Sequence, residues 1–142
     1  MTINWLTEGV QFPEVIEKTI VEQWLAKVAE AHGKIPGKLT YILTNDEGIL
    51  RVNREFLQHD YYTDIITFDY SKRKMINGDI YISLDTVSTN AEQFGQDPIR
   101  ELHRVIAHGL LHLCGINDKG PGEREIMERH EDEALQLLFE ML

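Results

Sequence analysis

The sequence predicts an α+β fold, with a single small mixed sheet of about four strands covered by about five helices. Short segments rich in β-branched and aromatic residues are interspersed with longer segments whose apolar residues recur three and four positions apart. Glycine, proline and asparagine residues separate these segments. The chain has 142 residues and contains neither a repeat nor a long linker, so we expect residues 1–142 to form a single domain.

The predicted strands are recognised by their composition. Residues 2–6 are expected to form a short edge strand, and the segment KLTYILTN at residues 38–45 a second strand. The segments DIITFDY at residues 64–70 and GDIYISL at residues 78–84 are separated by the polar sequence SKRKMIN. We therefore expect these last two strands to pair with each other in antiparallel fashion.

Helices are predicted where apolar residues recur at helical spacing between residues that favour helix ends. They comprise residues 13–32, residues 46–57, residues 85–94, a helix that starts at residue 97 and a last helix that follows residue 122. Pro13 suits the first turn of the first helix, and Asp46, Asp85 and Asp97 are expected to be N-caps. The acidic residues of segment 123–133 are expected to form the solvent-exposed face of the last helix.

The helix that starts at Asp97 carries the segment HGLLHLCGIND at residues 108–118. His108 and His112 are four residues apart, so they lie one turn apart on the same face of a helix. Gly115 is expected to end the helix in the left-handed conformation, which costs glycine little. The chain can then fold back towards the histidines. We therefore predict a metal site formed by His108, His112 and Asp118.

An apolar stripe next to the histidines would hold this helix against the core. It is expected to comprise Ile99, Leu102, Ile106, Gly109, Leu110 and Leu113. The spacing of the two histidines, the glycine and the aspartate matches that of zinc proteases with the pattern H-E-x-x-H-x-x-G-x-x-H. The glutamate that acts as general base in those proteases is replaced here by Gly109. A peptidase is therefore a poor candidate.

The other histidines and the cysteine have simpler explanations. Two histidines on an amphipathic helix are by themselves a weak signal, but the glycine and the aspartate at matching offsets favour a metal site. Cys114 would point away from the ligands and is expected to be a packed thiol. His32, His103 and His130 lack partners in the motif and are expected at the surface or at helix caps.

Composition limits the classes of function. The net charge is −10, with 24 acidic and 14 basic side chains. Polyanions are bound by cationic contacts, so this balance counts against a protein that coats nucleic acid, but a local basic surface or a metal could still engage a phosphate. The single cysteine excludes an intramolecular disulfide. No stretch approaches the roughly 20 apolar residues of a membrane span, and the start does not resemble a signal peptide, so we expect a soluble cytoplasmic protein without a membrane partner.

The segment HGLLHLCGIND resembles the signature H-G-x-L-H-L-x-G-Y-D-H of the YbeY family of bacterial rRNA maturation factors. Residues 53–70, NREFLQHDYYTDIITFDY, are similar to the family's helix followed by a T-[DN]-V-L-S-F strand, and residues 77–83, NGDIYIS, to its L-G-D-I-x-I-S strand. The resemblance covers nearly the whole chain. It implies a zinc-dependent, single-strand-specific endoribonuclease that acts in rRNA maturation, especially at the small-subunit rRNA 3′ end, and in ribosome quality control. It also implies one zinc ion as cofactor and single-stranded RNA or rRNA and the ribosome or its small subunit as partners, with no role for DNA.

Four positions depart from the family pattern. The family's third histidine ligand aligns with Asp118, its preceding aspartate with Asn117 and its tyrosine with Ile116. A carboxylate is an acceptable zinc ligand, but it lowers the net charge of the site. The arginine that the family often carries before the T-[DN]-V-L-S-F strand aligns with Leu57. His59 or Arg54 could supply a cation in its place.

Two classes of function remain open at this point. The first is a hydrolase that cuts RNA, which requires a coordination position left open for water. Its catalytic base could be the metal hydroxide or a group from another segment. The alternative is a metal-stabilised factor for ribosome assembly that mainly binds and has weak or no nuclease activity, which a fourth protein ligand would favour.

Overall fold

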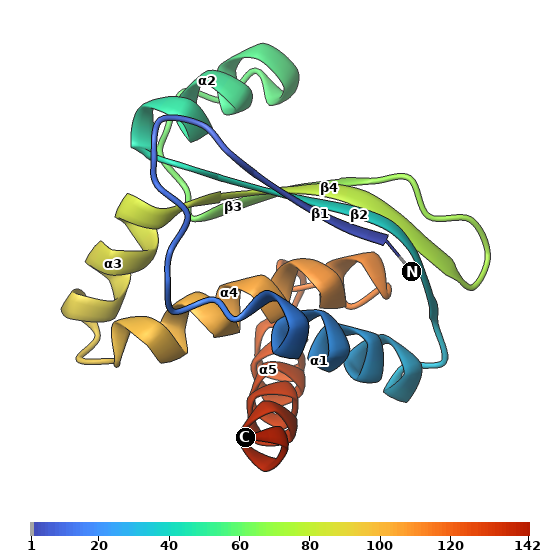
Figure 1. Cartoon of the computed structure of the whole chain (residues 1–142). Helices are drawn as coiled ribbons and strands as arrows, with labels where there is room; N and C mark the ends of the chain where they lie inside the picture. Colours follow the sequence, from blue (N-terminus) through green and yellow to red (C-terminus); the bar gives the residue numbers. More distant parts are fainter. Residues whose placement is uncertain (1) are drawn as a thin grey trace.

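The computed structural model describes residues 2–142, which form one four-stranded sheet and five helices (Figure 1). In chain order, the elements are β1 (Thr2–Thr7), α1 (Lys18–Ala31), β2 (Ile35–Thr44), α2 (Asp46–Leu57), β3 (Ile65–Asp69), β4 (Met75–Ser83), α3 (Leu84–Gln93), α4 (Pro98–Leu113) and α5 (Glu123–Met141). The predicted α+β fold class is confirmed. None of the helices between residues 2 and 142 is long and apolar enough to cross a membrane.

The sheet is mixed, and its strands follow the order β1-β2-β4-β3. β1 pairs with β2 and β2 with β4 in parallel, whereas β3 pairs with β4 antiparallel. The predicted edge position of β1 and the predicted antiparallel pairing of β3 with β4 are therefore confirmed. β3 forms the other edge of the sheet, so one side of it is free to border a cavity.

Helices cover the two faces of the sheet unequally. α1, α4 and α5 lie below the sheet in Figure 1, and α2 lies above it. The larger core fills the space on the first side and includes Trp24, Leu25, Tyr41, Ile80 and Ile106. A small second cluster of Ile49, Val52 and Ile66 attaches α2 to the opposite face. Most of the apolar burial therefore holds α4 and α5, the helices that carry the site.

Two buried hydrogen bonds connect the layers. The Tyr41 hydroxyl donates to the backbone carbonyl of Ile106 at 2.8 Å, and Trp24 Nε1 donates to the carbonyl of Ala134 at 2.7 Å. A buried polar group without a partner would cost about 1–3 kcal/mol, so both bonds favour one arrangement of these elements. The first fixes α4 against β2, and the second fixes α5 against α1.

Several predicted helix starts need correction. The first helix begins at Lys18 rather than near Pro13, because the Glu17 side chain accepts a hydrogen bond from Ile20 N and caps it there. The N-cap of α2 is Asn45, and that of α3 is Ser83. The aspartates that follow these two residues are the first or second residue of the helix instead. A neighbouring side chain that reaches the free N–H groups thus takes the capping role.

Most of the residues predicted to cap α4 or to form its apolar stripe have the predicted positions. Asp97 caps the helix by accepting a hydrogen bond from Ile99 N. Ile99 itself was predicted in the apolar stripe but is 48% exposed, because it lies in the first turn, where the helix leaves the core. The prediction for His103 is also wrong, since this residue is buried and its Nδ1 lies 2.7 Å from the carbonyl oxygen of Ile99. His32 is the C-cap of α1, in agreement with the prediction that it lies at the surface or at a helix cap.

Candidate metal centre

Gly109 allows α4 to approach the sheet closely beside His108. A Cβ atom at position 109 would lie 2.8 Å from Ile80 Cγ2 and 3.1 Å from Ile65 Cδ1. A side chain at this position would therefore overlap β3 and β4 unless the helix moved. The close contact leaves no room for the general-base glutamate of the zinc proteases, which counts against the peptidase alternative.

Gly115 ends α4 as the sequence predicts. Its φ of +95° is in the left-handed region. Gly115 N donates to the carbonyl of His112 at 3.0 Å, and Ile116 N donates to that of Leu111 at 3.1 Å. This pair of hydrogen bonds is the Schellman pattern of helix ends. The turn redirects the chain, so that Asp118 lies back against the last two turns of the helix.

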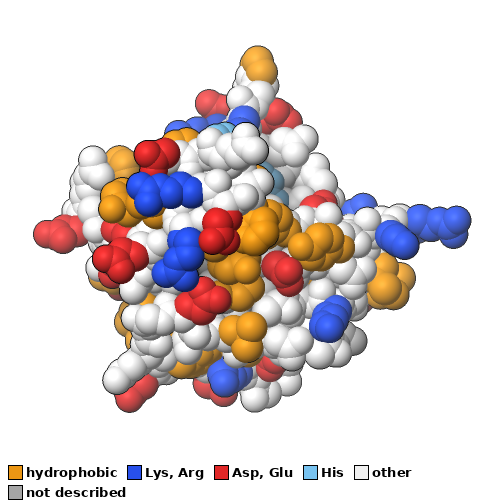
Figure 2. Space-filling view, turned by 90° about the horizontal axis from the view of Figure 1, so that it is seen from above, with side chains coloured by type: hydrophobic (Ala, Val, Ile, Leu, Met, Phe, Trp, Pro, Cys, Tyr) orange, Lys and Arg blue, Asp and Glu red, His pale blue; other side chains and the backbone are white. Residues whose placement is uncertain are grey.

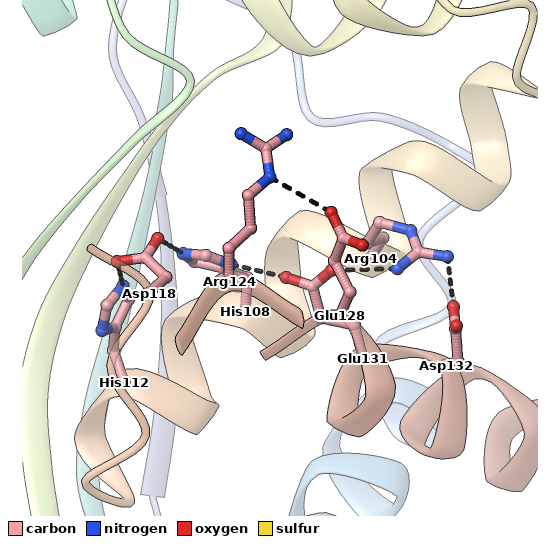
Figure 3. Close-up of polar contacts among 8 residues, drawn as sticks. All are labelled: Arg104, His108, His112, Asp118, Arg124, Glu128, Glu131 and Asp132. Atoms are coloured by element: carbon pink, nitrogen blue, oxygen red, sulfur yellow. Dashed lines mark hydrogen bonds and ion pairs between the residues drawn. The ribbon is translucent and has the colours of Figure 1, made fainter. Parts of the chain in front are cut away.

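His108, His112 and Asp118 lie together (Figure 3). His108 Nε2 is 3.3 Å from Asp118 Oδ2, and His112 Nε2 is 3.5 Å from Asp118 Oδ1. One ligand atom from each residue lies within 4.8 Å of the other two. Tetrahedral zinc with ligands at about 2.0–2.2 Å places neighbouring ligand atoms about 3.4 Å apart. The spacing and the two-nitrogen, one-oxygen donor set therefore fit one zinc ion.

Glu131 of α5 holds His108 from the other side of its ring (Figure 3). His108 Nδ1 lies 2.5 Å from Glu131 Oε2. Because a carboxylate only accepts hydrogen bonds, Glu131 favours a proton on Nδ1, and in the neutral ring Nε2 then keeps the lone pair that a metal ion requires. The other oxygen of Glu131 accepts from Arg104 at 2.9 Å, and Arg104 also donates to Asp132 at 2.6 Å. Glu131 thereby sets the tautomer and the orientation of one candidate ligand.

The sequence prediction missed Glu131. It assigned the acidic residues of α5 to the solvent-exposed face, but Glu131 is 6% exposed, so this assignment is wrong at that position. Glu131 follows the buried Met127 by four residues and precedes the buried Ala134 by three. An acidic residue at a buried helical position needs a partner. The spacing of Glu131 from Met127 and Ala134 was therefore the sequence feature that could have identified it as buried and paired.

Burial and neighbouring charges shift several pKa values around the site. Burial alone would lower the pKa of His108, but the hydrogen bond and charge of Glu131, with further carboxylates, raise it above its usual value. Burial, with the neighbouring His108, lowers the pKa of His112. Burial raises the pKa of Asp64 and of Glu101. These two carboxyls are therefore better suited to accept and release a proton near neutral pH than ordinary carboxyls.

Cys114 is a buried thiol, as predicted, and is not part of the metal-binding group. It is 8% exposed, and burial raises its pKa to about 11. A thiol with so high a pKa is protonated at neutral pH and is a poor nucleophile or metal ligand.

The candidate ligands line a cavity of about 750 Å³ between α4, α5 and the edge strand β3. Its charged lining residues are the carboxylates Asp64, Glu101, Asp118, Glu128, Glu131 and Asp132 and the cations Arg104, Lys119 and Arg124. Acidic groups thus outnumber basic ones. Leu57 and His59 also line the cavity. Arg54, the other proposed replacement for the family arginine, pairs with Asp60 at 2.5 Å and is not among the lining residues.

Replacement of Asp118 tests the third ligand. Loss of a residue that only hydrogen-bonds to a metal ligand weakens metal binding roughly 10- to 100-fold. Asp118→Ala is expected to weaken it by more, because it removes a ligand atom. Asp118→His is expected to retain the metal, since it restores the ligand set of the family signature. Competition with a chromophoric chelator measures both affinities. Asn117→Ala, on the same loop, is the control, and an unchanged affinity in Asp118→Ala would exclude this residue as a ligand.

Comparisons with known proteins identify the family. The family model described as "Endoribonuclease YbeY" matches residues 3–138. A protein of Parabacteroides distasonis named "Endoribonuclease YbeY" is 59% identical over 140 residues, which cover 99% of this chain and 98% of that protein. A protein of the same name from Phocaeicola vulgatus is 60% identical over 136 residues, or 96% of this chain and 98% of that one.

A solved structure has the same fold. The solution structure of TM1509 from Thermotoga maritima matches with a TM-score of 0.69 at 25% sequence identity, over 99% of this chain and 91% of that one. The family match includes α4, most of α5 and nearly all of the sheet against which they pack. The resemblance inferred from the sequence is therefore confirmed, and the chain belongs to the YbeY family.

Proposed function

We propose that this member of the YbeY family is an endoribonuclease that uses one zinc ion, held by His108, His112 and Asp118, to cut single-stranded RNA. Its biological substrate is precursor rRNA, in particular the 3′ end of the small-subunit rRNA, and it acts in the cytoplasm on the ribosome or its small subunit during maturation and quality control. The names of its relatives support the activity. The three-residue ligand group at a large cavity carries the proposal.

A zinc ion at this site would polarise a phosphate oxygen and lower the pKa of a bound water. The protein residues would hold and orient the ligands. Glu131 accepts the Nδ1 proton of His108, so that Nε2 is left free to bind the ion. Asp64 and Glu101 line the same cavity and are carboxyls whose pKa burial raises. They are therefore the two protein groups that we propose to exchange a proton with the reacting water.

The assembly-factor alternative requires a closed site. Structural zinc sites have four protein ligands, whereas catalytic sites have three and leave a position for water. Between residues 2 and 142, the group that could hold a metal consists of two histidines and one aspartate. Three ligands beside a cavity of about 750 Å³ favour hydrolysis over a purely structural ion.

The activity is tested with metal-loaded protein and four substrates: single-stranded RNA, duplex RNA, DNA and a denatured protein. Cleavage is expected for single-stranded RNA alone, and His112→Ala is expected to reduce it to background. Equal cleavage by wild type and variant would indicate a contaminating nuclease and contradict the proposal. Association with ribosomal subunits without any cleavage would instead establish the assembly factor.

A further inference from the structure

We propose that His59 and Tyr61, together with Phe94, form a stacking site for an unpaired nucleobase of the RNA. The choice of RNA as the ligand rests on the proposed function. All three residues line the cavity that contains the candidate metal ligands. His59 and Tyr61 belong to the loop between α2 and β3, and Phe94 is the C-cap of α3. The site is thus assembled from two separate segments that line one cavity.

The rings are exposed, and two of them already stack on each other. Tyr61 is 53% exposed and Phe94 is 67% exposed. The His59 and Tyr61 rings stack with centroids 5.1 Å apart and planes 20° apart, and the Tyr61 hydroxyl lies 2.9 Å from His59 Nδ1. A preformed stack of flat rings loses little freedom when a further ring is added to it. It is therefore suited to bind a flat ligand.

The backbone of the loop is held independently of these rings. The side chain of Asn53, a buried residue of α2, donates to the backbone carbonyl of Tyr61 at 2.9 Å. Replacement of the Tyr61 side chain leaves this bond intact. The stack can therefore be removed without releasing the loop.

The charge of the cavity indicates why such a site is needed. Its lining contains six carboxylates and three cations. Arg104 is shared by Glu131 and Asp132, and Arg124 pairs with Glu128. Figure 2 shows one whole face of the molecule, where acidic side chains are interspersed with basic ones and hydrophobic side chains gather near the middle. Apart from a bound metal ion, the side chains of the cavity therefore attract phosphate only weakly, whereas stacking does not depend on charge.

A nucleobase is the ligand that fits this combination. Every base has a flat face, so stacking binds single strands irrespective of sequence, and bases within a duplex are not available for it. A site of this kind next to the metal centre would select unpaired nucleotides. It would also compensate for Leu57, which stands where family members often carry an arginine.

The test compares Tyr61→Ala, Tyr61→Phe, Phe94→Ala and Tyr62→Ala. Tyr62 is the matched control, because it is an adjacent tyrosine with 58% exposure that does not line the cavity. The probe is a short fluorescein-labelled single-stranded RNA, and its affinity is measured by fluorescence anisotropy at several salt concentrations. Measurements with EDTA prevent cleavage, so the comparison remains valid even if the protein proves not to be a nuclease. Circular dichroism verifies that each variant is folded.

Tyr61→Ala and Phe94→Ala are each expected to weaken binding of the single strand about 5- to 150-fold. The slope of affinity against salt should stay unchanged, because no phosphate contact is removed. Tyr61→Phe and Tyr62→Ala should bind as wild type does. Wild-type affinity in both alanine variants, or an equal loss for duplex RNA, would overturn the proposal. Normal RNA binding with loss of binding to purified ribosomal subunits would overturn it in favour of a protein-docking surface.

Discussion

Protein in which both His108 and His112 are replaced by alanine is expected to fold and to contain no bound metal. Each histidine supplies one ligand atom, and the remaining carboxylate of Asp118 cannot retain an ion by itself. Elemental analysis of protein purified without an affinity tag should find about one equivalent of zinc in wild type and a trace in the variant. The fold should survive, because neither histidine belongs to the hydrophobic core that α1, α4, α5 and the sheet form.

His130→Ala is the control for this experiment, since it removes a histidine outside the ligand group. Thermal unfolding with and without a chelator gives a second measurement. Metal at about 100 times its dissociation constant adds about 2.7 kcal/mol to the free energy of unfolding. Chelation should therefore lower the melting temperature of wild type and leave the double variant unchanged. One equivalent of zinc in the double variant would refute the assignment, and complete unfolding of chelated wild type would favour a structural ion.

Glu131→Ala is expected to weaken zinc binding about 10- to 100-fold while all three ligands remain in place. The substitution removes the acceptor that holds His108 Nδ1 and leaves Arg104 with Asp132 alone. His108 can then adopt the other tautomer or rotate its ring away from the metal. Glu131→Gln is expected to lose less zinc affinity, because the amide oxygen can still accept a hydrogen bond from His108 Nδ1.

Glu128→Ala is the matched control, since Glu128 lies on the same helix and the same cavity but pairs with Arg124. Nitrogen NMR of the histidine rings gives a measurement that a general loss of stability would not change. Wild type should show His108 protonated at Nδ1, and Glu131→Ala should show a mixture of tautomers. Wild-type zinc affinity in Glu131→Ala would mean that Glu131 does not position the ligand.

The core of the candidate metal centre could be predicted because it is local in sequence. His108 and His112 are placed by the helical repeat, and Gly115 by the conformation that a helix end requires. The structure brings the three predicted residues together, with distances of 3.3 and 3.5 Å from the histidines to Asp118. Helix starts were less predictable, because Asn45 and Ser83 compete with the adjacent aspartates for the same N–H groups.

The sequence by itself thus determined the α+β class, the pairing of β3 with β4 and the order of the motif residues, since each depends on residues close together in the chain. Only the tertiary structure decided that Glu131, 23 positions after His108, orients its ring, and that Gly109 lies against Ile80. It also brought His59, Tyr61 and Phe94 to one cavity from separate segments. The physical reason is that these contacts arise when α4 packs between the sheet and α5. The periodicity of one segment shows which of its own residues are buried, but not which residues of another segment they will contact.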